Sequence, residues 1–200
     1  MMSCMTAAVL AISGKRFYGK DTLAELLCDL AQQAGKPLLR HALADQSKEG
    51  FADSHTAAGA PVDARRLKTD RLYKERWRPE LTAYTEAELA RDPLVFCKRL
   101  LAAARGQAAP AILISDLRLL CELEWLRERG AFLARLHVEG SVRAGFGWSF
   151  QEGVDDHRTE TELDGRSDWD AVVVNPGTRA GLEEEAVALL AAFWSAPGTP

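Results

Sequence analysis

The chain has 200 residues, of which 47% are hydrophobic and 27% are charged, and its formal net charge is −4. This length suits one α/β domain with a full hydrophobic core, and the composition is ordinary for a globular chain. The acidic balance argues against a general nucleic-acid-binding protein, which usually carries a basic excess. No apolar run reaches the roughly 18 residues that a membrane-spanning helix needs.

Targeting and redox signals are also missing from the sequence. Residues 1–6 lack the charged segment that opens a signal peptide. The four cysteines, Cys4, Cys28, Cys97 and Cys121, lie far apart without a C-x-x-C motif. Cys28 and Cys97 fall in expected amphipathic helices, which favours buried thiols. We therefore expect a cytoplasmic monomer with a single domain over residues 1–200.

The most informative stretch begins after an apolar run at 7–12 that suits a buried strand. It reads Gly14-Lys15-Arg16-Phe17-Tyr18-Gly19-Lys20-Asp21, and leucines at helical spacing follow over 21–30. The pattern G-x-x-x-x-G-K between a strand and a helix is typical of a P-loop. Glycines let backbone N–H groups turn inward around phosphate oxygens, and the helix N-terminus adds its positive dipole. We expect Lys20 to reach the β- and γ-phosphates of a nucleotide.

Three residues of this stretch differ from what a simple nucleotide-binding P-loop needs. Lys15 and Arg16 indicate more negative charge than one nucleotide brings. Asp21 stands where a P-loop usually has Ser or Thr, so its carboxylate either binds magnesium through water or caps the helix. A chance glycine-rich turn before an amphipathic helix is the alternative, but the strand and the helix both fall where a P-loop needs them.

The middle of the chain suggests a helical insertion at about 43–90. A short strand at 37–42 precedes a polar stretch that holds Lys48, and 56–61 is typical of a loop. Residues 63–84 are rich in Lys and Arg, which form either a solvated helical face or an anion-binding insertion. Asp92-Pro93 then predicts a helix start with an acidic N-cap, and the helix should end near Gly106.

The next two expected strands each carry a candidate site residue. The run 111–116 ends in Asp116, the kind of acid that holds magnesium in P-loop enzymes, and Arg118 follows at the edge where open α/β sheets bind ligands. A helix at 119–129 leads to a strand at 132–138. Arg135 within that strand indicates either an anion to be met or an outward position on an edge strand.

The last third of the chain suggests a lid at about 140–165, then a strand at 169–175 and a helix at 178–194. Residues 141–148 mix glycine and aromatic side chains with Arg143, as a mobile lid does. His157 lies among acids, but their spacing matches no standard metal site. Alternating strands and helices predict a five-stranded, mostly parallel sheet with helices on both faces. With the P-loop and the Arg-bearing lid, this is the layout of small-molecule and nucleoside monophosphate kinases.

The chain resembles the animal-type phosphomevalonate kinases almost from end to end. The most specific matches are the Gly-Lys-Arg-x-x-Gly-Lys-Asp loop at 14–21 and Gly147-Trp148 followed by Gly153-Val154-Asp155-Asp156. Ser115-Asp116-Leu117-Arg118 is a further match. Members of this family transfer the γ-phosphate of ATP to mevalonate 5-phosphate. The resemblance implies a P-loop kinase fold that uses ATP and Mg²⁺.

The resemblance also implies roles for individual residues. The nucleotide would be bound by Gly14, Lys15, Arg16, Gly19, Lys20, Asp21, Asp155 and Asn175. The phosphorylated substrate would be bound by Lys48, Lys74, Arg78, Arg118 and Arg135. The catalytic cations would be Lys20, Arg118 and Arg143, and the magnesium ligands would be Asp116 and Asp21.

Several positions depart from the family and bear on the acceptor. Phe17 and Tyr18 replace a Lys and a Ser, Leu119 replaces a second Arg, and an upstream Arg is missing near 89–90. The lid is also one residue longer before Gly147, so Arg143 is only the nearest match to a lid arginine. Each lost cation removes a charge-assisted contact of roughly 1.5–3 kcal/mol if nothing replaces it.

Two alternatives therefore remain open. Phage-type deoxynucleoside monophosphate kinases share the Gly-Lys-Asp loop and an Asp-x-His-x-Ser/Thr-Glu pattern, which 155–160 fits with Asp155, His157, Thr159 and Glu160. Such an acceptor needs a slot for its base, which Phe51, Tyr73, Trp77 or Tyr84 could line. The other alternative is a protein that binds ATP without transferring phosphate.

Overall fold

The computed structural model describes residues 7–105, 107, 110–197 and 199. The chain forms two compact units, a sheet unit of Met1–His41 with Ala104–Pro200 and a helical unit of Ala42–Ala103. The expectations for residues 1–6 and for a helix end at Gly106 concern residues outside the described part. Among the described residues, no helix has the length and apolar character needed to cross a membrane.

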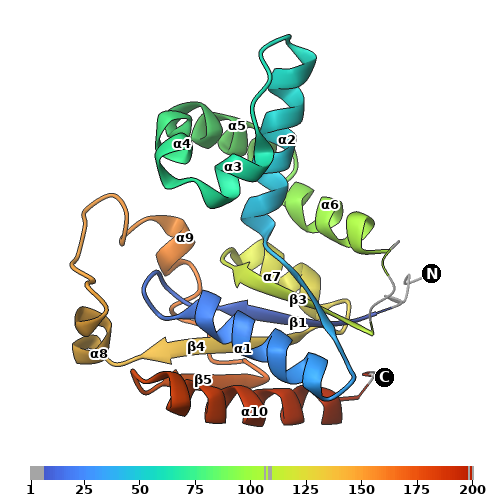
Figure 1. The fold of residues 1–200 in the computed structure, drawn as a ribbon, viewed down its shortest axis with the longest axis vertical. Helices are drawn as coiled ribbons and strands as arrows, with labels where there is room; N and C mark the ends of the chain where they lie inside the picture. Colours follow the sequence, from blue (N-terminus) through green and yellow to red (C-terminus); the bar gives the residue numbers. More distant parts are fainter. Residues whose placement is uncertain (1–6, 106, 108–109, 198, 200) are drawn as a thin grey trace. The chain divides into compact units, whose positions relative to one another are not determined.

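Five parallel strands form the centre of the sheet unit, in the order β2-β3-β1-β4-β5 (Figure 1). The strands are β1 (Ala8–Ser13), β2 (Leu38–His41), β3 (Ala111–Leu117), β4 (Phe132–Val138) and β5 (Ala171–Asn175). The predicted five-stranded α/β fold is therefore confirmed. Because β1 lies at the centre with β3 and β4 beside it, the residues that follow these three strands meet at one edge of the sheet.

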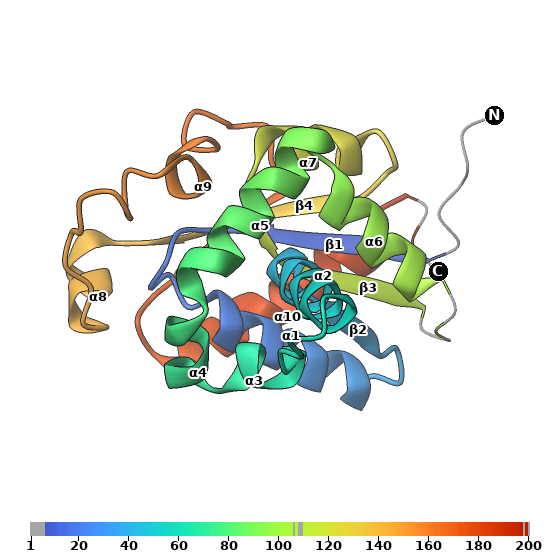
Figure 2. The ribbon, with the colours of Figure 1, turned by 90° about the horizontal axis from the view of Figure 1, so that it is seen from above.

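Helices cover both faces of this sheet. The helices α1 (Lys20–Gln33) and α10 (Arg179–Ser195) pack side by side on one face, and α7 (Leu120–Arg127) covers the other (Figure 2). Leu10 and Ile12 of β1 are fully buried in the cluster that includes α1 and α10. Both faces of β1 are buried, which explains why its sequence is a continuous apolar run rather than an alternating one.

The position of β4 in the sheet decides between the two interpretations of Arg135. It lies between β1 and β5, so Arg135 is not on an edge strand. Its guanidinium instead donates from Nη1 to Ser13 Oγ at 2.8 Å and from Nη2 to Asp164 Oδ1 at 3.0 Å. The anion that a cation in an interior strand requires is thus supplied by the protein itself.

The helical unit contains α2 (Leu43–Ala57), α3 (Ala64–Thr69), α4 (Arg71–Arg76), α5 (Arg78–Arg91) and α6 (Val95–Ala104). The helix α2 continues to Ala57, past the start of the expected loop. Asp92 accepts from the Leu94 N–H, and α6 begins only at Val95, so the expected Pro93 start was two residues early. The ends of these helices thus differ from those expected from the sequence.

The aromatic residues of the helical unit form its core. Phe51 is 1% exposed, and its ring centroid lies 4.4 Å from His55, 6.0 Å from Trp77 and 5.8 Å from Tyr84. Tyr73 packs against the same cluster. These rings contact one another, so the side chains expected to line a base slot serve as packing within this unit.

The expected lid contains two short helices of the sheet unit, α8 (Gly140–Gly145) and α9 (Arg158–Thr161). His157 Nδ1 accepts from the Thr159 N–H and so caps α9. No group of three or more His, Cys, Asp or Glu residues in the described part of the chain is arranged to hold a metal ion. The His-x-Thr pair that matched the alternative kinase family thus has a local structural role.

Replacing Phe193 by alanine should destabilise the sheet unit by about 3–5 kcal/mol. Phe193 on α10 is fully buried, with its ring centroid 5.9 Å from that of Phe132, and its removal leaves a cavity. Urea unfolding measures the loss. Val187→Ala on the same helix is the control, because Val187 is 52% exposed and should change stability by less than about 0.5 kcal/mol. Equal effects of the two variants would contradict this packing.

Candidate active site

The loop between β1 and α1 has the geometry of a phosphate-binding loop. A Cβ atom on Gly14 would lie 3.1 Å from the Leu136 carbonyl oxygen, so this position tolerates little more than glycine. Gly19 has φ +89°, and a Cβ there would lie 2.6 Å from Asn175 Nδ2. Phe17 also has a positive φ, of 60°. A side chain at Gly14 would therefore require β4 to shift slightly, and one at Gly19 would be strained by the left-handed backbone and would press on Asn175.

Lys20 is the first residue of α1 and lies half-buried beneath this loop. Its Nζ donates to the Lys15 carbonyl oxygen at 2.7 Å. Burial lowers the pKa of Lys20 to about 7, and repulsion from Arg118 adds to the effect, while Glu160, Asp21 and Asp116 act in the opposite direction. An ammonium group held in this way gains strongly from an additional anion, which is what a phosphate provides.

The acids of the lid pair with the cations and an amide of the loop. Lys15 Nζ lies 2.5 Å from Asp164 Oδ2, and the same carboxylate accepts from Arg135. The backbone N–H of Arg16 donates to Glu160 Oε2 at 2.7 Å, and Arg118 Nη1 pairs with Glu160 Oε1. Residues that the sequence assigned to phosphate groups are therefore matched by carboxylates in this structure.

Arg143 reaches the loop from α8 but is held on all sides. It is 8% exposed, and its Nε and Nη2 donate to the Arg16 carbonyl oxygen at 3.1 and 2.9 Å. The guanidinium carbon lies 4.0 Å from the ring centroid of Trp148 and 4.9 Å from that of Tyr18. In this arrangement Arg143 supports the backbone of the loop, and its expected catalytic role stays a prediction.

Asp155 lies next to Arg143 and holds the lid residues around it. Its carboxylate accepts from Trp148 Nε1 at 3.0 Å and from the Gln151 N–H at 2.8 Å, and it lies 3.4 Å from Arg143. Burial acts to raise the pKa of Asp155, but these hydrogen bonds and the charges of Arg16 and Arg143 outweigh burial and hold the pKa below its usual value. The ionised carboxylate thus connects the lid to the loop through Arg143, which donates to the Arg16 carbonyl oxygen.

Asn175, at the end of β5, fixes the other side of the loop. Its Nδ2 donates to the Tyr18 carbonyl oxygen at 2.9 Å, and its Oδ1 accepts from the Gly177 N–H at 2.9 Å. Because both polar atoms of this buried side chain are used, its contribution to a nucleotide site is to hold the loop in shape.

The two expected magnesium ligands lie in different surroundings. The Asp21 side chain is 88% exposed and pairs with Arg40 of β2 at 2.5 Å. It does not cap α1, whose N-cap is Gly19 without a side-chain hydrogen bond. Asp116 lies at a register shift in β3, where Ala11 pairs with Ile114 but Ser13 pairs with Leu117. Both carboxylates act on the charge of Lys20, and Mg²⁺ bound largely by phosphate and water needs only one or two such groups.

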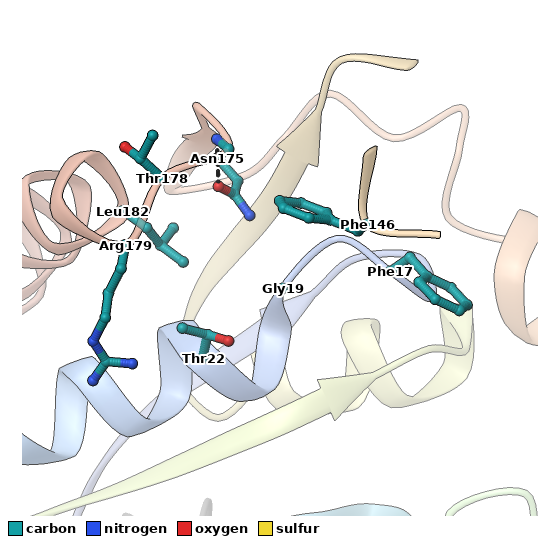
Figure 3. Close-up of a pocket in the computed structure, with 9 residues that line it drawn as sticks. Phe17, Gly19, Thr22, Phe146, Asn175, Thr178, Arg179 and Leu182 are labelled. Atoms are coloured by element: carbon teal, nitrogen blue, oxygen red, sulfur yellow. Dashed lines mark hydrogen bonds between the residues drawn. The ribbon is translucent and has the colours of Figure 1, made fainter. Parts of the chain in front are cut away.

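A pocket of about 230 Å³ adjoins the loop on the side of α10 (Figure 3). Its lining consists of Phe17, Gly19, Thr22, Phe146, Asn175, Gly177, Thr178, Arg179 and Leu182. In the close-up, the Phe146 ring lies between Asn175 and the part of the loop that carries Phe17. Apolar rings and a few polar groups beside a phosphate-binding loop suit the flat base and the ribose of a nucleotide.

The helical unit carries its own cluster of cations. Burial lowers the pKa of Lys74, and the nearby charges of Lys48 and Arg78 lower it further. Lys48 pairs with Asp45 at 2.7 Å, and Arg78 Nε donates to Glu75 at 2.6 Å. Three of the five expected substrate-binding cations thus lie together, where an anionic ligand would relieve their mutual repulsion.

Comparison with known proteins identifies the family. The model of the family described as phosphomevalonate kinase matches residues 12–132. A phosphomevalonate kinase of Drosophila melanogaster is 30% identical over an alignment of 188 positions, which covers 91% of this chain and 94% of that protein. The chain belongs to the phosphomevalonate kinase family.

The fold is also shared with a solved structure. The crystal structure of TT1252 from Thermus thermophilus superposes with a TM-score of 0.60 at 19% identity, covering 92% of this chain and 97% of that one. This likeness concerns the fold alone. It agrees with the five-stranded α/β architecture expected from the sequence.

Three acids near the loop received no site role from the sequence. Glu160 and Asp164 contact P-loop residues directly, as described above. Glu122 accepts from the N–H groups of Leu119 and Arg118 at 2.9 and 3.1 Å, and burial raises its pKa to about 7. The acids at 155, 160 and 164 could be seen in the sequence. Only the fold shows that their carboxylates contact the P-loop.

The departures from the family are accommodated by packing. Leu119 is 3% exposed at the start of α7, so the position of the missing second arginine is an apolar interior site in this protein. Tyr18 is 8% exposed and lies beside His137, with ring centroids 6.0 Å apart. These substitutions replace polar contacts by buried apolar surface.

The lowered pKa of Lys20 should make stability depend on pH. The folded chain holds the pKa of Lys20 at about 7 against 10.5 in the unfolded state. Between these values the unfolded state binds more protons, so this residue makes stability rise as the pH increases from 7 toward 10. Urea unfolding of Lys20→Met should show a smaller rise between pH 7 and 9 than the wild type. Parallel pH profiles of the two proteins would refute this assignment.

Proposed function

We propose that this protein transfers the γ-phosphoryl group of ATP to the phosphate of phosphomevalonate, which yields the diphosphate and ADP. The observation that carries this proposal is the half-buried Lys20 beneath a glycine loop, in a chain of the phosphomevalonate kinase family. The loop has the shape that phosphate binding requires, and family membership points to the acceptor. A cytoplasmic monomer stays a prediction from the sequence.

The nucleotide is assigned to the P-loop and the adjoining pocket. The phosphates interact with the loop N–H groups between Gly14 and Gly19 and with the cations Lys15, Arg16 and Lys20. Phe17 and Phe146 line the pocket that takes the base. Asp155 supports the loop through Arg143, and Asn175 supports it by donating to the Tyr18 carbonyl oxygen. The nucleotide site thus combines binding groups with groups that hold them in place.

The acceptor carries a phosphate and a carboxylate, so it needs cations. In the helical unit we assign its anionic groups to Lys48, Lys74 and Arg78, whose mutual repulsion an anion relieves. In the sheet unit we assign Arg118 and Arg135 to the acceptor phosphate or to the transferring group. Both guanidiniums are paired with carboxylates in this structure, which shows that their surroundings accommodate anions.

The reaction needs positioning and charge more than proton transfer. The attacking oxygen of the acceptor phosphate is already anionic, so no strong general base is required. Lys20 and Arg118 neutralise negative charge as the γ-phosphoryl group passes between two oxygens in line. Mg²⁺ supplies further neutralisation of the phosphate charge when bound, and Asp116 and Asp21 are the residues that would hold it.

The acceptor is tested by direct comparison. We expect phosphomevalonate to give a higher kcat/KM than any deoxynucleoside monophosphate when ADP release is measured at equal acceptor concentration with Mg-ATP. A preference of about a hundredfold for a deoxynucleotide, roughly 2.7 kcal/mol of discrimination, would reject this acceptor but keep the kinase activity. Lys20→Ala is the control, because it should lower kcat by about 10²-fold or more while leaving the fold intact. No ADP release by the wild type with any acceptor would indicate a protein that only binds ATP.

Replacing Arg118 should separate the acceptor from the nucleotide. Arg118→Ala removes a guanidinium next to Lys20, so we expect a higher KM for the acceptor, a lower kcat, or both, with a smaller change in ATP affinity. Steady-state kinetics and calorimetry with ATP measure the two effects. Arg166→Ala is the control, because Arg166 pairs with Asp168 away from the loop. Lower ATP affinity with normal acceptor kinetics would make this assignment wrong.

A further inference from the structure

Glu160 makes the contacts that a phosphate oxygen would make in a P-loop kinase. One carboxylate oxygen accepts from the Arg16 N–H, which is a P-loop amide, at 2.7 Å. The other pairs with the guanidinium of Arg118. The side chain is buried, at 9% exposure, and its charge acts on Lys20. Three groups expected to meet phosphate thus interact with a single internal carboxylate.

The neighbouring acids of the same segment extend this pattern. Asp164 pairs with Lys15, and Asp155 lies 3.8 Å from the Arg16 guanidinium. The acidic segment, residues 155–164, therefore supplies one carboxylate for each cation or amide at this end of the loop. Carboxylates and phosphates use the same charge-assisted hydrogen bonds, so both kinds of anion require the same donors.

We infer that Glu160 is an internal competitor of nucleotide phosphate, and that its carboxylate leaves the Arg16 N–H and Arg118 when a phosphate ligand binds. This inference rests on the proposed nucleotide site. Two anions cannot share these donors, because each needs the same N–H groups and because like charges at contact distance repel. Glu160 accepts the hydrogen bonds of the Arg16 N–H and Arg118 that a phosphate would otherwise accept. It therefore lowers the affinity of the loop for phosphate.

The position of Glu160 gives this competition a structural consequence. Glu160 lies on α9, a helix of only four residues, and α9 follows the stretch that carries Trp148 and Asp155. Release of the Glu160 carboxylate removes a hydrogen bond between α9 and the loop, while Asp164 and Arg143 still contact the loop through Lys15 and the Arg16 carbonyl oxygen. Nucleotide binding is then coupled to a local rearrangement of α9, because the phosphate takes the Arg16 N–H to which Glu160 is bonded in this structure.

The inference is tested with tripolyphosphate, which offers phosphate groups without a base or ribose. Calorimetry should show that Glu160→Gln binds tripolyphosphate about tenfold more tightly than the wild type. Glutamine keeps the size of the side chain and an acceptor for the Arg16 N–H, but it loses the charge that Arg118 and Lys20 attract. Glu152→Gln is the matched control on the exposed part of the lid, and its affinity should stay within twofold of the wild type.

A second variant covers the case in which Glu160→Gln does not fold. Glu160→Asp keeps the charge but withdraws it from the loop, and it should also bind tripolyphosphate more tightly than the wild type. Thermal unfolding establishes that each variant is folded. Unchanged or weaker binding by a folded Glu160 variant would overturn the inference and make Glu160 a support of the occupied site.

The outcome for the proposed function is separate. If the wild type binds neither tripolyphosphate nor Mg-ATP, the nucleotide site and the inference both fail. If the wild type binds them and the folded variants bind no more tightly, only the inference fails. Tighter binding by the variants, with no turnover of phosphomevalonate, would support the inference while rejecting the acceptor.

Discussion

The close fit of the P-loop against β4 and β5 is the constraint on which the rest of the site depends. Gly14 passes next to Leu136, and Gly19 passes next to Asn175 in a left-handed conformation. Because the loop is held at both ends, its N–H groups keep a fixed direction, and Lys20 is placed beneath them. The parallel sheet supplies this fit, since β1 lies centrally and its neighbours end at the same edge.

Such a loop concentrates positive charge, and the protein balances it internally. Lys15, Arg16, Lys20, Arg118 and Arg135 all lie near the loop, although the chain as a whole is acidic. The balance comes from the acidic segment, whose partners Lys15 and Arg16 lie 149 and 144 positions away in the sequence. Its partners Arg118 and Arg135 lie 42 and 29 positions away. Buried or half-buried cations without partners are costly, and the carboxylates of the lid supply these partners.

The positions that depart from the family show how such a site tolerates substitution. Phe17 lines the pocket beside the loop and is 40% exposed, whereas Tyr18 packs beneath Arg143 and Leu119 is buried at the start of α7. Tyr18 and Leu119 therefore gain stability from burial. Lys20 and Arg118, the cations to which we assign phosphate contacts, are retained. The substitutions thus alter the periphery of the site while its charged centre stays the same.

The sequence by itself determined the local parts of this protein. The strand–loop–helix around 14–21, the five strands and the two glycines follow from patterns within a few residues, because apolar runs, side-chain periodicity and motif spacing are local features of the sequence. The resemblance of the motifs also led to the family. The sequence was less reliable at helix ends, as at Val95, where one or two residues depend on packing.

Tertiary structure alone decided which charges meet. Arg135 pairs with Asp164 on an interior strand, Asp21 pairs with Arg40 rather than capping its helix, and Glu160 accepts from the Arg16 N–H. Each of these pairs joins residues that are 19 to 144 positions apart. No periodicity connects such residues, because their distance is set by the order of the strands and by the path of the lid over the sheet. The phosphate-binding loop could therefore be predicted from the sequence, whereas the carboxylates that pair with it could not.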